Sequence, residues 1–187
     1  MKRNDIGAVV FHREGKQFDG LVQLCVEAMH HEQGRCLHRV ADVGANMGES
    51  SAIFAMYYRH VYAVDTWAPR DLDLVREVTG NGISNSEVER SFDIRMQALS
   101  PIVCKVKYAS PAAAGRFPDG FFDLVYIDGS HDYDSVVADI QAWLPKTRAL
   151  IGGHDFCDTG DVCPAVIDEL GMPQWIFQDS SWMAVAP

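Results

Sequence analysis

The chain has 187 residues, of which 48% are apolar, and this is enough to form the core of one domain spanning residues 1–187. Its formal net charge of −10 disfavours a nucleic-acid surface, which needs clustered Lys and Arg, so we expect a small-molecule partner. The chain has no apolar run of eighteen residues, no apolar leader and no C-x-x-C pair among its five Cys, so we expect a cytoplasmic protein that contacts no membrane.

Apolar runs alternate with helical patterns along the chain. Helices are expected at 21–29, 48–58, 86–99, 135–144 and 161–170. Strands are expected at 39–43, 60–65, 102–108, 121–128 and 148–152, with a closing hairpin at 174–178 and 181–186. We expect residues 1–37 to form an N-terminal helical segment. Residues 66–90 are polar, with a short helix near 72–78, and we expect them to form a lid.

This alternation predicts an α/β sandwich with a mostly parallel sheet, covered by helices on both faces, and an antiparallel last strand. Ligands of such sheets bind beyond the carboxyl ends of the strands. Polar residues fall at or just past five expected strand ends: Asp42, Asp65, Ser110, Asp128 and Asp155. We therefore expect a binding site at this edge of the sheet.

Gly44 and Gly48 follow the first expected strand and allow a tight turn close to a ligand. The helix after them offers N–H groups to a carboxylate or phosphate. The spacing is G-x-x-x-G, which differs from both the dinucleotide motif and the phosphate loop. Asp65 ends the next strand, where it can accept both hydroxyls of a ribose or can simply be a solvated carboxylate.

Five segments together resemble the class I S-adenosylmethionine-dependent methyltransferases: residues 41–50 (ADVGANMGES), 64–67 (VDTW), 121–133 (FFDLVYIDGSHDY), 139–143 (DIQAW) and 152–156 (GGHDF). More narrowly, the combination of IDGSH with GGHD resembles the family that includes macrolide-sugar O-methyltransferases and cephalosporin-hydroxylase-like proteins. The resemblance spans residues 38–187 and implies a Rossmann-like class I fold with a seven-stranded sheet.

The resemblance also implies cofactor-binding roles. Gly44, Asn46 and Gly48 would wrap the methionine end of S-adenosyl-L-methionine. Ser50 or Ser51 would meet its carboxylate, and Asp42 its amino group, directly or through water. Asp65 would hold the ribose, Trp67 would lie near the adenosine or the substrate mouth, and Ser110 would border the adenine.

Methyl transfer to a neutral hydroxyl needs a base that takes the proton or a metal that lowers its pKa. The resemblance implies that Asp128 and Asp155 bind a divalent cation, that Asp128 also serves catalysis, and that His131 is the general base. Asp132 is then left to cap the following helix. Oxygen ligands favour Mg²⁺. His154 is a third candidate ligand. It stands where some relatives have an acidic residue, so a softer metal, no metal, or a His154 that only bonds to backbone all stay open.

We therefore expect an enzyme that transfers a methyl group from S-adenosylmethionine to a hydroxyl of a small molecule, such as a sugar. The alternatives are a related hydroxylase or tailoring enzyme on the same scaffold, and a cofactor-binding protein without catalysis. The intact His131 argues against the last of these. The acceptor would be enclosed by residues 66–90 or by a second subunit of a homo-oligomer.

Overall fold

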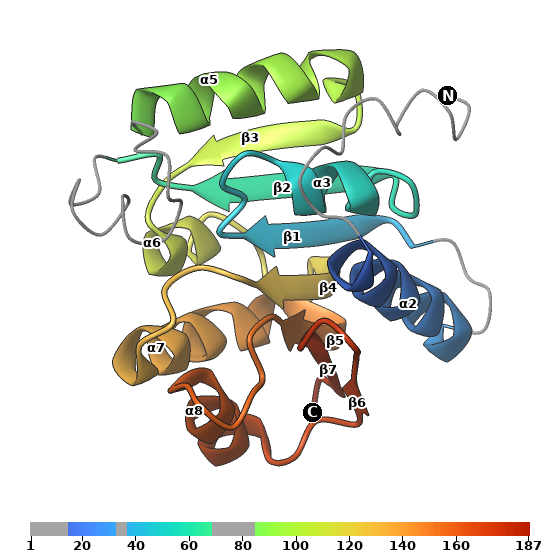
Figure 1. Ribbon diagram of the computed structural model, residues 1–187, viewed down its shortest axis with the longest axis vertical. Coiled ribbons are helices and arrows are strands. Elements are labelled where there is room, and N and C mark those ends of the chain that lie inside the picture. The colour runs from blue at the N-terminus through green and yellow to red at the C-terminus, as the bar shows by residue number, and fades with distance from the viewer. Residues whose placement is uncertain (1–14, 33–36, 69–84) are drawn as a thin grey trace.

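The computed structural model describes residues 15–32, 37–68 and 85–187, and its described residues form a seven-stranded sheet with helices on both faces (Figure 1). The strands are β1 (Arg39–Val43), β2 (His60–Asp65), β3 (Val103–Lys107), β4 (Phe122–Ile127), β5 (Thr147–Gly153), β6 (Trp175–Ile176) and β7 (Trp182–Val185). Their order is β3-β2-β1-β4-β5-β7-β6. The first five are parallel, and β7 is antiparallel to both β5 and β6. This confirms the expected fold class.

The helices are α2 (Lys16–His31), α3 (Glu49–Phe54), α5 (Asn85–Met96), α6 (Ser110–Ala114), α7 (Tyr133–Trp143) and α8 (Val162–Leu170), with short 3-10 turns η1 (Gln97–Leu99) and η2 (Leu144–Lys146). The helix expected at 48–58 ends four residues early, because turns follow Phe54. The helix α6 was not expected. Residues 85–90 of the expected lid belong to α5, whereas residues 69–84, including the helix expected at 72–78, lie outside the described residues.

Two hydrophobic cores form, one on each face of the sheet. α2, α3 and α5 pack on one face, and α6, α7 and α8 pack on the other. Successive strand residues point to opposite faces, so in β4 Leu124 and Tyr126 enter the first core while Val125 and Ile127 enter the second. Burial on both faces explains why the central strands are almost continuously apolar.

The order of the strands creates the binding crevice. From the central strand β1, the chain proceeds to β2 and β3 on one side and to β4 and β5 on the other. The loops after β1 and β4 therefore diverge, and the space between them is where parallel sheets bind ligands. None of the described helices is long and apolar enough to cross a membrane.

Candidate functional site

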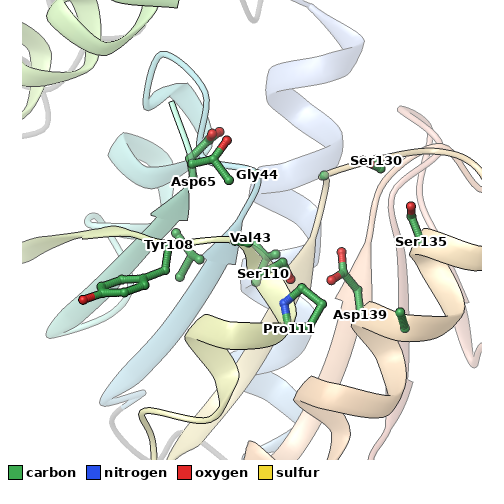
Figure 2. A pocket seen from close by; sticks show the side chains of 14 residues that line it. Val43, Gly44, Asp65, Tyr108, Ser110, Pro111, Ser130, Ser135 and Asp139 are labelled. Atoms are coloured by element: carbon green, nitrogen blue, oxygen red, sulfur yellow. The ribbon is translucent and has the colours of Figure 1, made fainter. Parts of the chain in front are cut away.

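A pocket of about 280 Å³ lies past the carboxyl ends of β1, β2 and β4. Figure 2 shows Asp65 and Tyr108 on one side of it, and Ser135 and Asp139 of α7 on the opposite side. Its walls also include small and apolar residues: Val43, Gly44, Val64, Ala109, Pro111 and Ala138. No Lys or Arg lines it among the described residues. Such a pocket suits a flat, partly apolar ligand that carries hydrogen-bond donors and no phosphate.

The glycine turn passes very close to the end of β4. Gly44 has a φ of +89°, and a Cβ at this position would lie 2.0 Å from Asp128 O. Its N–H donates to Val64 O at 2.8 Å, while the N–H of Asp128 donates to Val43 O at 2.7 Å. Only glycine combines this conformation with so close an approach.

Gly48 packs closely against α5. It precedes α3 with a φ of +84°, and a Cβ there would lie 2.9 Å from both Met96 Cε and Phe92 Cδ2 of α5. The close approach of α5 therefore explains why position 48 has no side chain. Its contact with a cofactor stays a prediction.

Asp65 holds together the loops that follow β1 and β2. Its Oδ2 accepts from Asn46 N at 2.9 Å, and its Oδ1 accepts from Trp67 N at 2.9 Å. The indole N–H of Trp67 in turn donates to Asn46 O at 2.9 Å. Trp67 is buried, packs on Phe92 and is not among the pocket residues. Asp65 thus lines the pocket in a fixed orientation. The expected position of Trp67 near the adenosine or the substrate mouth stays a prediction.

The carboxylate of Asp42 lies in a buried network beneath the glycine turn. It accepts hydrogen bonds from Ser50 Oγ at 2.8 Å and from Ser51 Oγ. All three side chains are buried, and none of them lines the pocket. Both serine hydroxyls therefore have a partner inside the protein, and their expected contacts with a cofactor stay predictions.

Ser110 lies at the start of α6 and lines the pocket, and its contact with the adenine stays a prediction. Its Oγ accepts from the indole N–H of Trp143 at 2.8 Å and hydrogen-bonds to the Asp139 carboxylate. Burial raises the pKa of Asp139, and the Ser110 hydrogen bond partly opposes this rise. Sequence reasoning assigned no role to Asp139. The available signal was its spacing, since it lies three residues after Val136 and one before Ile140 on the buried face of α7.

Four side chains form an acidic–histidine cluster beside the pocket: Asp128, His131, His154 and Asp155. Three of them each offer a possible ligand atom, a carboxylate oxygen or an imidazole nitrogen, and these atoms lie within 4.8 Å of one another: Asp128, His131 and Asp155. His131 Nε2 is 3.3 Å from Asp155 Oδ2 and 3.8 Å from Asp128 Oδ1. Asp128 follows β4 and Asp155 follows β5, so adjacent parallel strands bring the two carboxylates together. Carboxylate and imidazole donors together can bind Mg²⁺, Mn²⁺ or a softer divalent ion.

His154 belongs to the same cluster. Its Nδ1 lies 2.9 Å from Asp155 Oδ1 and 3.9 Å from Asp128 Oδ1, and its side chain is largely buried. The side chain of His131 is 58% exposed and faces solvent. Asp132 caps α7, since its carboxylate accepts from Ser135 N at 3.0 Å, so His131 is not needed for capping. His154 therefore lies inside the cluster, while His131 lies where it can meet a ligand from solvent.

A family model described as a methyltransferase domain matches residues 41–156, from the glycine turn to the end of the acidic–histidine cluster. None of the curated proteins matches the chain.

Solved structures share the fold at low sequence identity. Cofactor-bound Rv0187 from MTB is 16% identical with a TM-score of 0.64, and the match covers 98% of this chain and 86% of that one. The tRNA (m1A58) methyltransferase TrmI from Aquifex aeolicus is 9% identical, with a TM-score of 0.58 and coverages of 88% and 58%. A SAM-dependent O-methyltransferase from Thermotoga maritima is 13% identical, with a TM-score of 0.51 and coverages of 78% and 47%. The chain thus spans only about half of the lengths of the last two proteins.

Proposed function

The chain belongs to the family of class I S-adenosylmethionine-dependent methyltransferases, and we propose that it methylates a hydroxyl group of a small molecule. The observation that carries this proposal is the position of the acidic–histidine cluster. It lies at the same edge of the sheet as the pocket, and Gly44 of the pocket wall approaches the backbone of Asp128. A base and a candidate cation site thus adjoin the place where the cofactor would bind.

The pocket residues fit the adenosine part of the cofactor. Asp65 offers carboxylate oxygens to the two ribose hydroxyls, which are hydrogen-bond donors. The absence of Lys and Arg from the described lining suits a nucleoside without phosphates. When bound, S-adenosylmethionine supplies a methyl group on a sulfonium centre.

His131 is the proposed general base. Its exposed imidazole takes the proton of the acceptor hydroxyl, and the imidazolium that results lies 3.3 Å from the Asp155 carboxylate, which stabilises the positive charge. A sugar is a suitable acceptor class because its hydroxyls are neutral and need this assistance. Asp128 and Asp155, with His154 beside them, would hold a divalent cation, which lowers the pKa of a nearby hydroxyl.

Isothermal titration calorimetry with S-adenosyl-L-homocysteine tests the cofactor assignment. We expect saturable binding, and Asp65→Ala should weaken it by roughly 10-fold or more because two hydrogen bonds to the carboxylate are lost. Asp134→Ala removes an exposed carboxylate from α7 and should leave binding unchanged. Thermal unfolding of each free variant separates lost contacts from lost structure, since Asp65 also supports two loops. The absence of any heat with the wild-type protein would contradict the proposal.

The roles in the cluster require a turnover assay. Formation of S-adenosylhomocysteine would be followed with a panel of hydroxylated small molecules that includes glycosides. Asp155→Ala and excess EDTA should each remove most of the activity, whereas Asp158→Ala, an exposed carboxylate three residues further on, should not. Full turnover in EDTA would remove the cation from the mechanism.

His131→Ala distinguishes a base from a metal ligand. If His131 is the base, His131→Ala should lower turnover by roughly 10²- to 10⁴-fold. The affinity of the variant for Mg²⁺ or Mn²⁺ should stay unchanged. A tenfold loss of metal affinity in this variant would instead make His131 a ligand. Binding of S-adenosylhomocysteine without turnover of any acceptor would favour a non-catalytic protein.

A further inference from the structure

Asp139 is a buried carboxylate on the wall of the pocket. It projects from the apolar face of α7, is 5% exposed, and is flanked there by Val136 and Ile140. Charged side chains are almost never buried so completely unless they are paired. No Lys, Arg or His hydrogen-bonds to Asp139 or pairs with it among the described residues, and burial raises its pKa accordingly. A group held at this cost on a pocket wall calls for a functional explanation.

A chain of hydrogen bonds fixes the orientation of this carboxylate. The indole N–H of Trp143 donates to Ser110 Oγ at 2.8 Å, and the Ser110 hydroxyl bonds to Asp139. Trp143 is fully buried, so the whole chain is anchored in the core. A carboxylate has about four acceptor positions, and Ser110 uses one of them. On the other side, the Oδ2 atom lies 3.5 Å from where a Cβ of Gly129 would be, which places it beside another pocket residue.

The pocket therefore has an acidic residue on each of two opposing sides, Asp65 and Asp139, with small apolar walls between them (Figure 2). Both carboxylates accept hydrogen bonds and, in their ionised form, donate none. The complementary ligand has donors at both ends of a flat, apolar body. An adenosine has this pattern, because its ribose carries two hydroxyls and its base carries an exocyclic amino group.

We propose that Asp139 recognises the exocyclic amino group of the cofactor's adenine and thereby selects adenosyl over 6-oxopurine ligands. This inference rests on the proposed function, since it takes Asp65 as the ribose partner. The 6-amino group donates a hydrogen bond that the ionised carboxylate of Asp139 accepts. A 6-oxo group would place a second acceptor against the Asp139 oxygen and would be repelled.

Calorimetric titrations with S-adenosyl-L-homocysteine and with its 6-oxo counterpart, S-inosyl-L-homocysteine, test this assignment. The wild-type protein should prefer the adenosyl ligand by roughly 10- to 100-fold, the range for a hydrogen bond to a charged group. In Asp139→Asn the preference should fall below about 3-fold, because the amide offers a donor to the 6-oxo group as well as an acceptor. Asp134→Asn makes the same chemical change on an exposed residue of α7 and should keep the wild-type preference.

The comparison of two ligands separates recognition from a structural role. A purely structural role for Asp139 would weaken both ligands equally in Asp139→Asn, and that result would overturn the inference. Equal binding of both ligands by the wild-type protein would overturn it as well. Failure of the wild-type protein to bind either ligand would overturn the proposed function itself.

A measurement on the wild-type protein alone covers the case in which Asp139→Asn does not fold. The ligand is the analogue of S-adenosyl-L-homocysteine in which unsubstituted purine replaces adenine. It lacks the 6-amino group and adds no acceptor at position 6. It should bind roughly 10-fold more weakly than S-adenosyl-L-homocysteine. Equal affinities for these two ligands would show that the amino group has no partner in the pocket.

Discussion

The close approach of Gly44 to the end of β4 can be tested by adding a single methyl group. In Gly44→Ala the new Cβ would lie 2.0 Å from Asp128 O, whereas ordinary contacts begin at 3.4 Å. The methyl group is bound directly to the backbone and has no rotamer that avoids the clash. The turn and the β4 end must therefore move apart, and both are held by short backbone hydrogen bonds.

The expected cost has two parts. A residue with a Cβ at positive φ costs about 1–2 kcal/mol. Separation of the two segments strains the bonds Gly44 N to Val64 O and Asp128 N to Val43 O, each worth about 0.5–1.5 kcal/mol. We therefore expect Gly44→Ala to lower the free energy of unfolding by about 2–5 kcal/mol. For a chain of this size, each kcal/mol lowers Tm by about 2–4 °C.

Gly120→Ala is the matched control. Gly120 also has a positive φ, of +63°, but a Cβ there would meet nothing within 4 Å, so this variant should show only the conformational part. Urea unfolding of both variants, monitored by circular dichroism, gives the difference that belongs to the clash, about 1–3 kcal/mol. If the two variants differ by less than about 0.5 kcal/mol, which is the size of a typical surface effect, the tight packing of the turn on β4 is wrong.

Two further predictions concern acid stability and thiol reactivity. Burial pushes the pKa of Asp123 upward, but hydrogen bonds from Arg39 N–H, the Arg148 guanidinium and a further backbone N–H outweigh it and lower the pKa overall. The stability that Asp123 contributes is thus present above about pH 4 and is lost as the pH falls below it. Between pH 7 and pH 3, the Asp123→Asn variant should therefore lose less stability than the wild-type protein, as measured by urea unfolding. The thiol of Cys25 is fully buried, and burial raises its pKa strongly. N-ethylmaleimide should therefore label exposed Cys104 in the native protein but Cys25 only after unfolding. Rapid labelling of Cys25 in the native protein, detected by peptide mapping, would contradict its burial.

Local patterns in the sequence were sufficient for most of the fold. β1 and β2 begin and end where expected, because short apolar runs rich in Val are bounded by turn residues and polar residues. The stripe of apolar residues on α7 and its Asp132 cap were also readable from spacing alone. The helix α6 was missed because its five residues are too few to show a helical period.

The site was predictable only in part. That Asp128 and Asp155 lie together follows from the rule that ligands gather at the carboxyl ends of parallel strands, and the register of β4 with β5 places them side by side. The reason for Gly48 was not predictable, because the glycine faces Phe92 and Met96 of α5, which lie more than forty residues away in the sequence. The Ser50 and Ser51 hydroxyls could not be assigned to Asp42 without the turn of α3 against β1.

The sequence by itself determined most of the strands and helices and which polar residues follow the strands, because burial imposes a local period on the chain. The tertiary structure alone decided which of those polar residues share a pocket. Asp65 and Asp139 come from elements on opposite sides of β1, and only the crossovers that order the strands β2-β1-β4 bring their carboxylates to face the same space. A carboxylate on the apolar face of a helix is visible in the sequence, but the partner that it faces depends on contacts between distant segments, which no local pattern encodes.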